Sequence, residues 1–214
     1  MVVAIDGPAG AGKSTLGRRL AEALGLPFVN TGLMYRSVAE RALRQGVDPD
    51  DGRALASIAR SIRFALSDGP LPELRIDGRE PDQALTSEEV ETTVSRVSRH
   101  PEVRAVLREE QQRLGANGGV VEGRDIGTVV FPDAHVKLFL AAPEAVRAGR
   151  REQERGGGTE SGAAALARDS VDARTIPLVA TPGAHVIETT SLSRDQVFEE
   201  ALAVIRAALQ GRGG

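Results

Sequence analysis

The chain has 214 residues, 41% of them hydrophobic, and a formal net charge of −3 at pH 7, which predicts one globular unit with a single core rather than two full domains. The slight negative charge argues against a general nucleic-acid binder, since such proteins carry a strong basic excess, and the lack of cysteine excludes disulfides, thiolate metal sites and cysteine nucleophiles. No apolar run approaches the ~20 residues of a membrane helix, and the N-terminus shows no signal-peptide pattern, so we expect a soluble, cytoplasmic protein without a membrane partner.

The first predicted element is a short buried strand at residues 2–5, and the octet GPAGAGKS at residues 7–14 follows it. Its spacing fits the pattern G-x-x-x-x-G-K-[ST], in which glycines let backbone N–H groups point at phosphate oxygens and the next helix adds its positive end. A chance glycine-rich turn before an ordinary helix is the alternative, but strand, loop and helix occur in the order that the motif requires. Lys13 would reach the β and γ phosphates of a nucleoside triphosphate, and Ser14 is the candidate ligand of the bridging Mg²⁺. The predicted triphosphate-binding residues are Gly7, Pro8, Ala9, Gly10, Ala11, Gly12, Lys13, Ser14 and Thr15.

The rest of the predicted core alternates helices with short apolar strands. The helix after the loop should end at Gly25, and a second strand follows at residues 28–30. Further strands are expected at residues 120–122, 136–141 and 185–188, and Ser193 with Gln196 forms a capping box for the last helix. This alternation predicts an α/β fold, a P-loop parallel β-sheet flanked by helices, with ligands at the carboxyl ends of its strands. The predicted core covers residues 1–31, 118–146 and 176–210.

Two stretches exceed a minimal core. Residues 32–117 show helical patterns at 33–45, 54–62, 88–98 and 103–114, with short strands at 63–66 and 74–77. Thr86 and Glu89 would form the capping box of the third of these helices. Residues 147–175 are rich in arginine, including Arg150 and Arg151. We interpret the first stretch as a small inserted subdomain and the second as a mobile lid.

A phosphate-binding loop alone allows a GTPase, a motor ATPase or a small-molecule kinase. The chain has no Asn-Lys-x-Asp sequence for reading guanine and no hydrophobic strand ending in paired acids. It does place arginine where a second phosphorylated molecule could be held, at Arg36, at Arg124 and in the lid. Phosphoryl transfer depends mainly on positioning and on positive charge around the moving group, so this pattern favours a kinase. The three histidines, His100, His135 and His185, are interpreted as structural.

Three longer runs resemble bacterial cytidylate kinases: AIDGPAGAGKST at residues 4–15, NTGLMYR at 30–36 and EGRDIGTVVFPD at 122–133. The resemblance covers nearly the whole chain, including the large insert that sets this family apart from other nucleoside monophosphate kinases. It implies that residues 32–117 bind the nucleoside monophosphate. It further implies ATP as the phosphate donor, CMP and dCMP as acceptors and Mg²⁺ as the cofactor, and we expect a monomer.

The resemblance also implies roles for individual residues. Lys13, Arg124 and Arg168 would be catalytic, stabilising the charge of the transition state. Thr31, Arg36 and Arg124 would hold the acceptor phosphate, and Arg168 would clamp the transferring phosphates. Asp172 would contact the sugar or orient an arginine. The residues expected to bind CMP are Thr31, Arg36, Ser95, Arg104, Arg124, Asp125, Arg168 and Asp172.

The base-reading role of Asp125 has an independent chemical reason. A carboxylate can accept a hydrogen bond from the exocyclic amino group of cytosine, and it would repel the O4 oxygen of uracil. Ser95 and Arg104 would face the same base according to the resemblance. The alternative is that Ser95 and Arg104 are solvated helix positions and that Asp125 caps the next turn. Asp6, just before the loop, would order waters around Mg²⁺ or simply end the strand, and it stays outside the predicted catalytic set.

The lid departs from the family pattern. The family spaces these residues as Arg-Asp-x-x-Asp-x-x-Arg before Pro-Leu, whereas this chain reads RDSVDAR at residues 168–174. Arg168 and Asp172, four residues apart, still share a helix face. Arg174 would leave that face unless the helix ends earlier, so its role is not settled. Arg150 and Arg151 likewise have no settled role.

Alternative functions are a P-loop kinase for UMP or another phosphorylated small molecule, or a nucleotide-binding regulatory switch, which would not need the Gly123-Arg124-Asp125 run.

Overall fold

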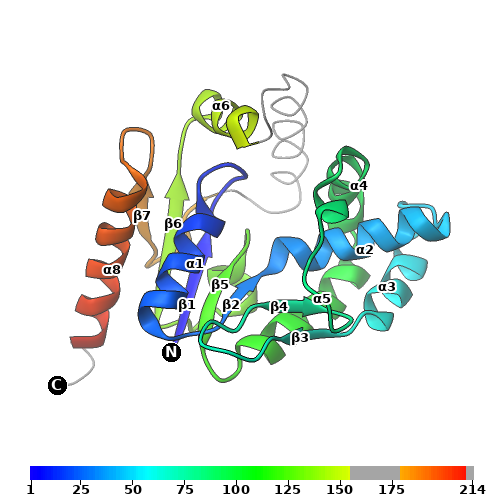
Figure 1. Ribbon diagram of the computed structural model, residues 1–214, viewed down its shortest axis with the longest axis horizontal. Coiled ribbons are helices and arrows are strands. Elements are labelled where there is room, and N and C mark those ends of the chain that lie inside the picture. Colours follow the sequence, from blue (N-terminus) through cyan, green and yellow to red (C-terminus); the bar gives the residue numbers. More distant parts are fainter. Residues whose placement is uncertain (155–178, 211–214) are drawn as a thin grey trace.

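A five-stranded parallel sheet forms the centre of the computed structural model, which describes residues 1–154 and 179–210 and the side chains of all of these except 151–154 (Figure 1). The strand order is β2-β5-β1-β6-β7, and each neighbouring pair runs parallel. The strands are β1 (Val2–Asp6), β2 (Phe28–Asn30), β5 (Gly119–Glu122), β6 (Val136–Ala141) and β7 (His185–Glu188). These bounds agree closely with the predicted strands, and the predicted α/β fold is confirmed.

The central strand β1 is buried on both faces, which explains its unbroken apolar sequence. Val3 and Ile5 pack into a cluster with helices α1 (Lys13–Leu24) and α8 (Arg194–Gln210), whereas Ala4 packs into a second cluster on the opposite face. Helix α8 begins with the predicted capping box, because Ser193 N donates to Gln196 Oε1 at 2.8 Å and Gln196 N donates to Ser193 Oγ at 3.2 Å. The sheet therefore separates two layers of side chains.

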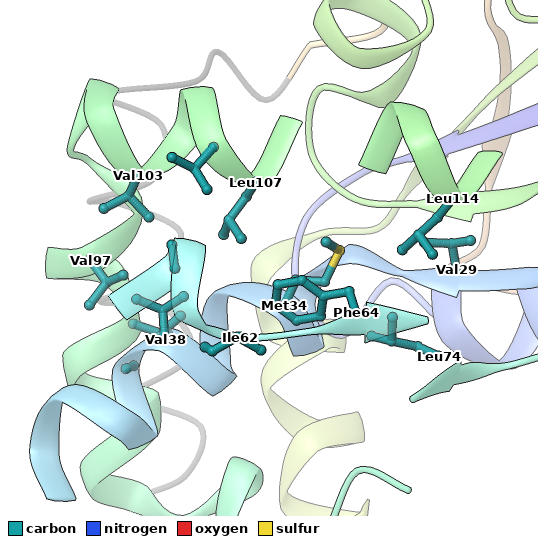
Figure 2. Close-up of a cluster of buried hydrophobic side chains, with 14 of the residues drawn as sticks. Val29, Met34, Val38, Ile62, Phe64, Leu74, Val97, Val103, Leu107 and Leu114 are labelled. Carbon is teal, nitrogen blue, oxygen red and sulfur yellow. The ribbon is translucent and has the colours of Figure 1, made fainter. Parts of the chain in front are cut away.

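The second cluster belongs mostly to the segment inserted between β2 and β5. This insert consists of α2 (Thr31–Gln45), α3 (Gly52–Ser61), β3 (Phe64–Leu66), β4 (Leu74–Ile76), the 3₁₀ turn η1 (Gln83–Thr86), α4 (Glu88–Ser98) and α5 (Pro101–Gly115). Figure 2 shows side chains from its helices and hairpin, among them Met34, Phe64 and Leu107, in one cluster with Val29 of β2. Strands β3 and β4 pair antiparallel. Phe28 N donates to Pro72 O at 2.8 Å, which ties the hairpin to β2.

The start of α4 corrects one prediction. Its N-cap is Ser87, whose Oγ accepts from Val90 N at 3.4 Å. Thr86 closes the preceding turn η1 by donating to Gln83 O at 2.8 Å. The predicted capping box of Thr86 with Glu89 was therefore wrong by one residue, because the short 3₁₀ turn engages the threonine hydroxyl.

The chain leaves β5 through residues 123–125 and the π turn η2 (Ile126–Val130), and it leaves β6 into helix α6 (Glu144–Glu154). Arg147 thus lies inside a helix that starts before the predicted lid boundary. Three residues of the predicted lid, Arg168, Asp172 and Arg174, lie outside the described residues, as does the side chain of Arg151. Within the described ranges, no helix combines the length and apolar character needed to cross a membrane.

Candidate functional site

The glycine-rich loop joins the carboxyl end of β1 to α1. Gly7, Gly10 and Gly12 all have positive φ, at 143°, 75° and 95°, a backbone region that favours glycine. A Cβ at Gly7 would lie 2.4 Å from the carbonyl oxygen of Leu140 in β6. The loop therefore needs glycine at Gly7 both for its backbone angle and for its close contact with the neighbouring strand.

Arg147 of α6 fixes the other side of this loop. Its side chain is buried, and it donates from Nη1 to Ala9 O at 3.1 Å and from Nε to Ala142 O at 3.0 Å. A Cβ at Gly10 would come within 2.9 Å of Arg147 O. The sequence placed Arg147 at the start of an arginine-rich lid, and its early position after β6 was the available signal that it belongs to the core.

A cavity of about 590 Å³ opens between the loop, the start of α2 and the segment after β5. Its lining comes from the core and from the insert, so the two parts of the chain share one site. Ser95 is not in this lining, but its Oγ is buried and has no hydrogen-bond partner within the described part of the chain. Ser98, one turn further along α4, does line the cavity, which sequence reasoning missed. The predicted residues brought together here are Ala9, Gly10, Gly12, Lys13, Ser14, Thr15, Thr31, Arg36, Arg104, Arg124 and Asp125.

One end of the cavity holds an ion pair between α5 and the segment after β5. Arg104 Nη2 lies 2.6 Å from Asp125 Oδ2, and the two side chains are 19% and 13% exposed. Asp125 makes no side-chain cap to η2, so the capping alternative was wrong, and Arg104 is not a solvated position. Tyr35 lies beside this pair, where burial raises the pKa of its phenol to about 12 and Arg104 acts in the opposite direction. This end therefore offers a donor and an acceptor to a polar ligand.

Further along the cavity, Arg36 of α2 is held by two groups of the insert. It donates to Leu85 O at 3.1 Å and forms an ion pair with Glu91 of α4. Its side chain is 11% exposed and that of Glu91 is 2% exposed, so Arg36 does not merely extend over the insert surface. Thr31 Oγ1 donates to Glu122 O at 2.8 Å. The threonine therefore fixes the end of β5 as well as lining the site.

Lys13 and Ser14 sit where the loop meets β5. Lys13 Nζ donates to Pro8 O at 2.8 Å, and Ser14 Oγ donates to Glu122 Oε1 at 2.7 Å. Glu122 is the last residue of β5, and its second oxygen, Oε2, is buried with no hydrogen-bond partner in the described ranges. Burial raises the pKa of this carboxyl, against the lowering effects of Lys13, Ser14 and nearby arginines.

Glu122 was missed by the sequence analysis as a site residue. The signal was present, because Glu122 is an acid that ends a buried strand, and β5 is the neighbour of β1 in the sheet. Parallel neighbours end at the same edge, which is how this carboxylate reaches Ser14 across 108 positions of sequence.

A second cavity of about 410 Å³ lies on the other side of the loop. It shares Gly10, Gly12 and Thr15 with the first and is also lined by the segment between β7 and α8. Arg150 also lines it and donates to Thr189 Oγ1 at 3.0 Å and to Thr189 O at 2.6 Å. The loop therefore has a cavity on each side, and Arg150 belongs to the second.

The predicted structural role of the histidines agrees with their contacts. His135 Nδ1 accepts from Val2 N at 3.2 Å, His100 Nε2 lies 3.0 Å from Pro49 O, and His185 pairs with Glu200 at 2.9 Å. None of the three lines either cavity.

Comparisons with known proteins agree with this architecture. The family model described as cytidylate kinase matches residues 3–207. The cytidylate kinase of Syntrophotalea carbinolica is 42% identical over 96% of this chain and 92% of its own length. The bifunctional pantoate ligase/cytidylate kinase of Gloeobacter violaceus is 41% identical over 97% of this chain, which spans only 38% of that longer protein. A similar bifunctional protein of a Synechococcus strain is covered to 43%.

Among solved structures, TT1252 from Thermus thermophilus shares the fold, with a TM-score of 0.50 at 24% identity, and the match covers 98% of this chain and 97% of that one. Structure and sequence comparisons thus agree over nearly the whole chain, and the resemblance seen in its motifs is confirmed. The chain belongs to the cytidylate kinase family.

Proposed function

We propose that the chain transfers the γ-phosphoryl group of ATP to CMP or dCMP. A phosphate oxygen of the acceptor would form a bond to the γ phosphorus as the bond from that phosphorus to the β-phosphate bridge breaks, leaving ADP and a cytidine diphosphate. One observation carries the proposal: a single cavity joins the phosphate-binding loop to two further arginines and to the Arg104–Asp125 pair. A simple triphosphate switch has no need of this second half.

Different side chains along the cavity would bind the phosphates and the acceptor base. Lys13 would contact the β and γ phosphates, and Arg36 with Arg124 would hold the acceptor phosphate. The position of these cations in one cavity favours the charge that develops on the moving phosphoryl group. At the far end, Asp125 would accept from the cytosine amino group, and Arg104 would donate to an acceptor atom of the base. Thr31 would join the phosphate contacts from the start of α2.

Ser95 remains a proposed contact of the acceptor base on the strength of the family pattern, although its buried hydroxyl does not line the cavity. Its Oγ is an unpaired polar atom on the helix that flanks the cavity, and such atoms destabilise a fold unless a ligand or water satisfies them. Arg168 and Asp172 remain proposed contacts of the transferring phosphates and of the sugar, on the strength of the family pattern alone.

The residues at the loop suit Mg²⁺ bound mainly through phosphates. Within the described ranges, no group of three or more acidic, histidine or cysteine residues could hold a metal by itself. Mg²⁺ in such sites keeps several waters and takes few protein ligands. The Ser14 hydroxyl would be a direct ligand, and the unpaired Oε2 of Glu122 would accept from a metal-bound water. When bound, the ion would neutralise charge on the β and γ phosphates.

The second cavity is the proposed place for the donor base. It lies against the same glycines as the phosphate site and is open enough, at about 410 Å³, for a planar ring. The guanidinium of Arg150 would stack on that ring, while its contacts with Thr189 hold it in place.

Initial rates for CMP, dCMP, UMP and AMP under one Mg·ATP condition test the proposal. We expect ADP formation to depend on the acceptor and CMP or dCMP to be preferred. If ADP appears no faster with CMP than with water as the acceptor, the kinase proposal fails. If UMP or AMP is the better acceptor, the base-reading roles of Ser95, Arg104 and Asp125 are wrong.

Asp125→Asn separates base reading from general damage to the site. The amide keeps the size of the side chain and an acceptor oxygen, but it loses the charge that pairs with Arg104. We expect the loss in kcat/KM to fall mainly on CMP and dCMP. An equal loss for every acceptor would show that Asp125 does not read the base.

A further inference from the structure

Asp6 contacts the acceptor side of the site although it directly precedes the donor loop. It is the last residue of β1, and its side chain is buried. One carboxylate oxygen accepts from Ile126 N at 2.8 Å, and the other accepts from Gly127 N at 2.8 Å. These two amides follow Asp125 immediately in the chain.

The segment from Glu122 to Gly127 is held at both of its ends. Before Arg124, Gly123 N donates to Ile5 O at 2.9 Å, and the carbonyl of Glu122 accepts from Thr31. After Asp125, the carboxylate of Asp6 accepts hydrogen bonds from the next two backbone N–H groups. Arg124 and Asp125 therefore project into the cavity from a short segment that is fixed on each side.

A carboxylate suits this position better than any neutral side chain of its size. Two adjacent N–H donors need two acceptor oxygens, and a carboxylate presents both. An asparagine would present one oxygen and would turn its own NH₂ toward the second N–H group. Burial raises the pKa of Asp6 while the two amide contacts lower it, so the buried charge depends on these hydrogen bonds.

Packing leaves this segment little freedom to shift. A Cβ at Gly127 would lie 3.3 Å from Asp6 Oδ2 and 3.2 Å from the side chain of Lys137. At Gly123, a Cβ would lie 2.7 Å from the side chain of Ile126. Because the surroundings are close-packed, the hydrogen bonds of Asp6 determine the position at which the Asp125 side chain contacts Arg104.

We propose that Asp6 is a positioning residue for acceptor choice: by fixing the backbone after Asp125, it sets where the Asp125 carboxylate meets the acceptor base. This inference rests on the proposed function. It assigns Asp6 to the acceptor half of the site, whereas its place in the sequence beside the loop would assign it to the donor half.

Asp6→Asn and Asp6→Ser test this role, with kcat/KM measured for CMP and for UMP and the KM for ATP measured at saturating CMP. Misplacing a reacting or selecting group by about 1 Å lowers rates up to about a hundredfold, and we expect the CMP-to-UMP ratio of kcat/KM to fall by about tenfold or more. The KM for ATP should stay within about twofold. Asp6→Ser keeps an acceptor oxygen without the clash of the amide, so it remains informative if the asparagine variant does not fold.

Gln112→Ala is the matched control. Gln112 Nε2 donates to Val130 O at 2.9 Å, which holds the opposite end of η2 from α5. If loosening of this turn alone mattered, Gln112→Ala would lower the CMP-to-UMP ratio as much as the Asp6 variants do. That result would overturn the inference.

A double-mutant cycle completes the test. If Asp6 acts through Asp125, then Asp6→Asn added to Asp125→Asn should change the CMP-to-UMP ratio by less than about twofold. In the wild type, ADP formation no faster with CMP than with water overturns the proposed function, and equal kcat/KM for CMP and UMP overturns the base-reading role of Asp125 and this inference with it. A wild-type preference that both Asp6 variants retain overturns the inference alone.

Discussion

Glu122→Gln should lower the catalytic rate with little loss of stability. The buried carboxylate contacts Ser14 through one oxygen and leaves the other unpaired in the described ranges. Burial dominates its environment and raises its pKa, which means that the charged form is less favourable in the folded protein than in the unfolded chain. Glutamine has nearly the same shape and removes this unfavourable charge.

The expected stability change is small. The hydrogen bond from Ser14 would pass from a charged to a neutral acceptor, a loss of about 1 kcal/mol, and relief of the buried charge would offset it. A net change within about 1 kcal/mol would shift Tm by no more than about 4 °C for a domain of this size. Activity should respond far more, because groups that support a metal site typically account for about 10–100-fold in activity or metal affinity.

The assay is the rate of ADP formation at saturating CMP, titrated with Mg²⁺, together with thermal unfolding. We expect kcat to fall by about 10–100-fold and the Mg²⁺ requirement to rise, while Tm stays nearly constant. Glu91→Gln is the control, since Glu91 is the other buried carboxylate of this cavity and pairs with Arg36. It should alter the KM for CMP and leave the Mg²⁺ requirement unchanged. A large drop in the Tm of Glu122→Gln with an unaltered kcat would refute the reasoning.

Three further predictions follow from local contacts. The pKa of Asp77 is lowered, chiefly by its hydrogen bond from Arg41. The stability that this carboxylate contributes is therefore present at neutral pH and is lost as the pH falls below ~4. In urea unfolding, Asp77→Asn should be less stable than the wild type at pH 7 and equally stable in acid. Tyr35 is the one tyrosine of a chain without tryptophan, so phenolate absorbance should rise near pH 12 in the native protein and near pH 10 in urea. A native transition near pH 10 would contradict its burial. Gly7→Ala should abolish ATP binding and lower stability by about 1–3 kcal/mol or more, whereas Gly12→Ala, with strained φ but open space, should be milder by calorimetry.

Local signals were enough to predict the fold. Each core strand is a short apolar run between turn residues, and the GPAGAGKS loop identifies the edge at which ligands bind. The capping box of Ser193 and Gln196 is a contact between residues three positions apart, so sequence alone could specify it. The Thr86 prediction failed because two candidate caps, Thr86 and Ser87, are adjacent in the sequence, and only the 3₁₀ turn decides between them.

The unpredicted features of the site are contacts between residues far apart in the chain. Glu122 reaches Ser14, and Arg147 reaches Ala9, because neighbouring strands end at one edge of the sheet. Asp6 was considered for Mg²⁺ or for ending a strand, yet its partners lie 120 and 121 positions away. No spacing within a motif encodes such pairs. Family resemblance assigned Arg104 and Asp125 separately to the acceptor base, but it did not predict the ion pair between them.

The continuous cluster between the insert and the sheet has a consequence for how the protein unfolds. Ala4, Val29 and Val121 of the core strands share one apolar cluster with the helices and hairpin of the insert, and Figure 2 shows Val29 within it. Most of this cluster comes from the insert, but the cluster continues onto the sheet, so a fragment of residues 32–117 would expose the surface that normally covers the sheet. We expect one calorimetric transition for both parts. If the insert were exchanged for that of a related protein, the sheet residues that pack against it would have to be exchanged as well. A change of acceptor through the insert must therefore be accompanied by a change in core packing.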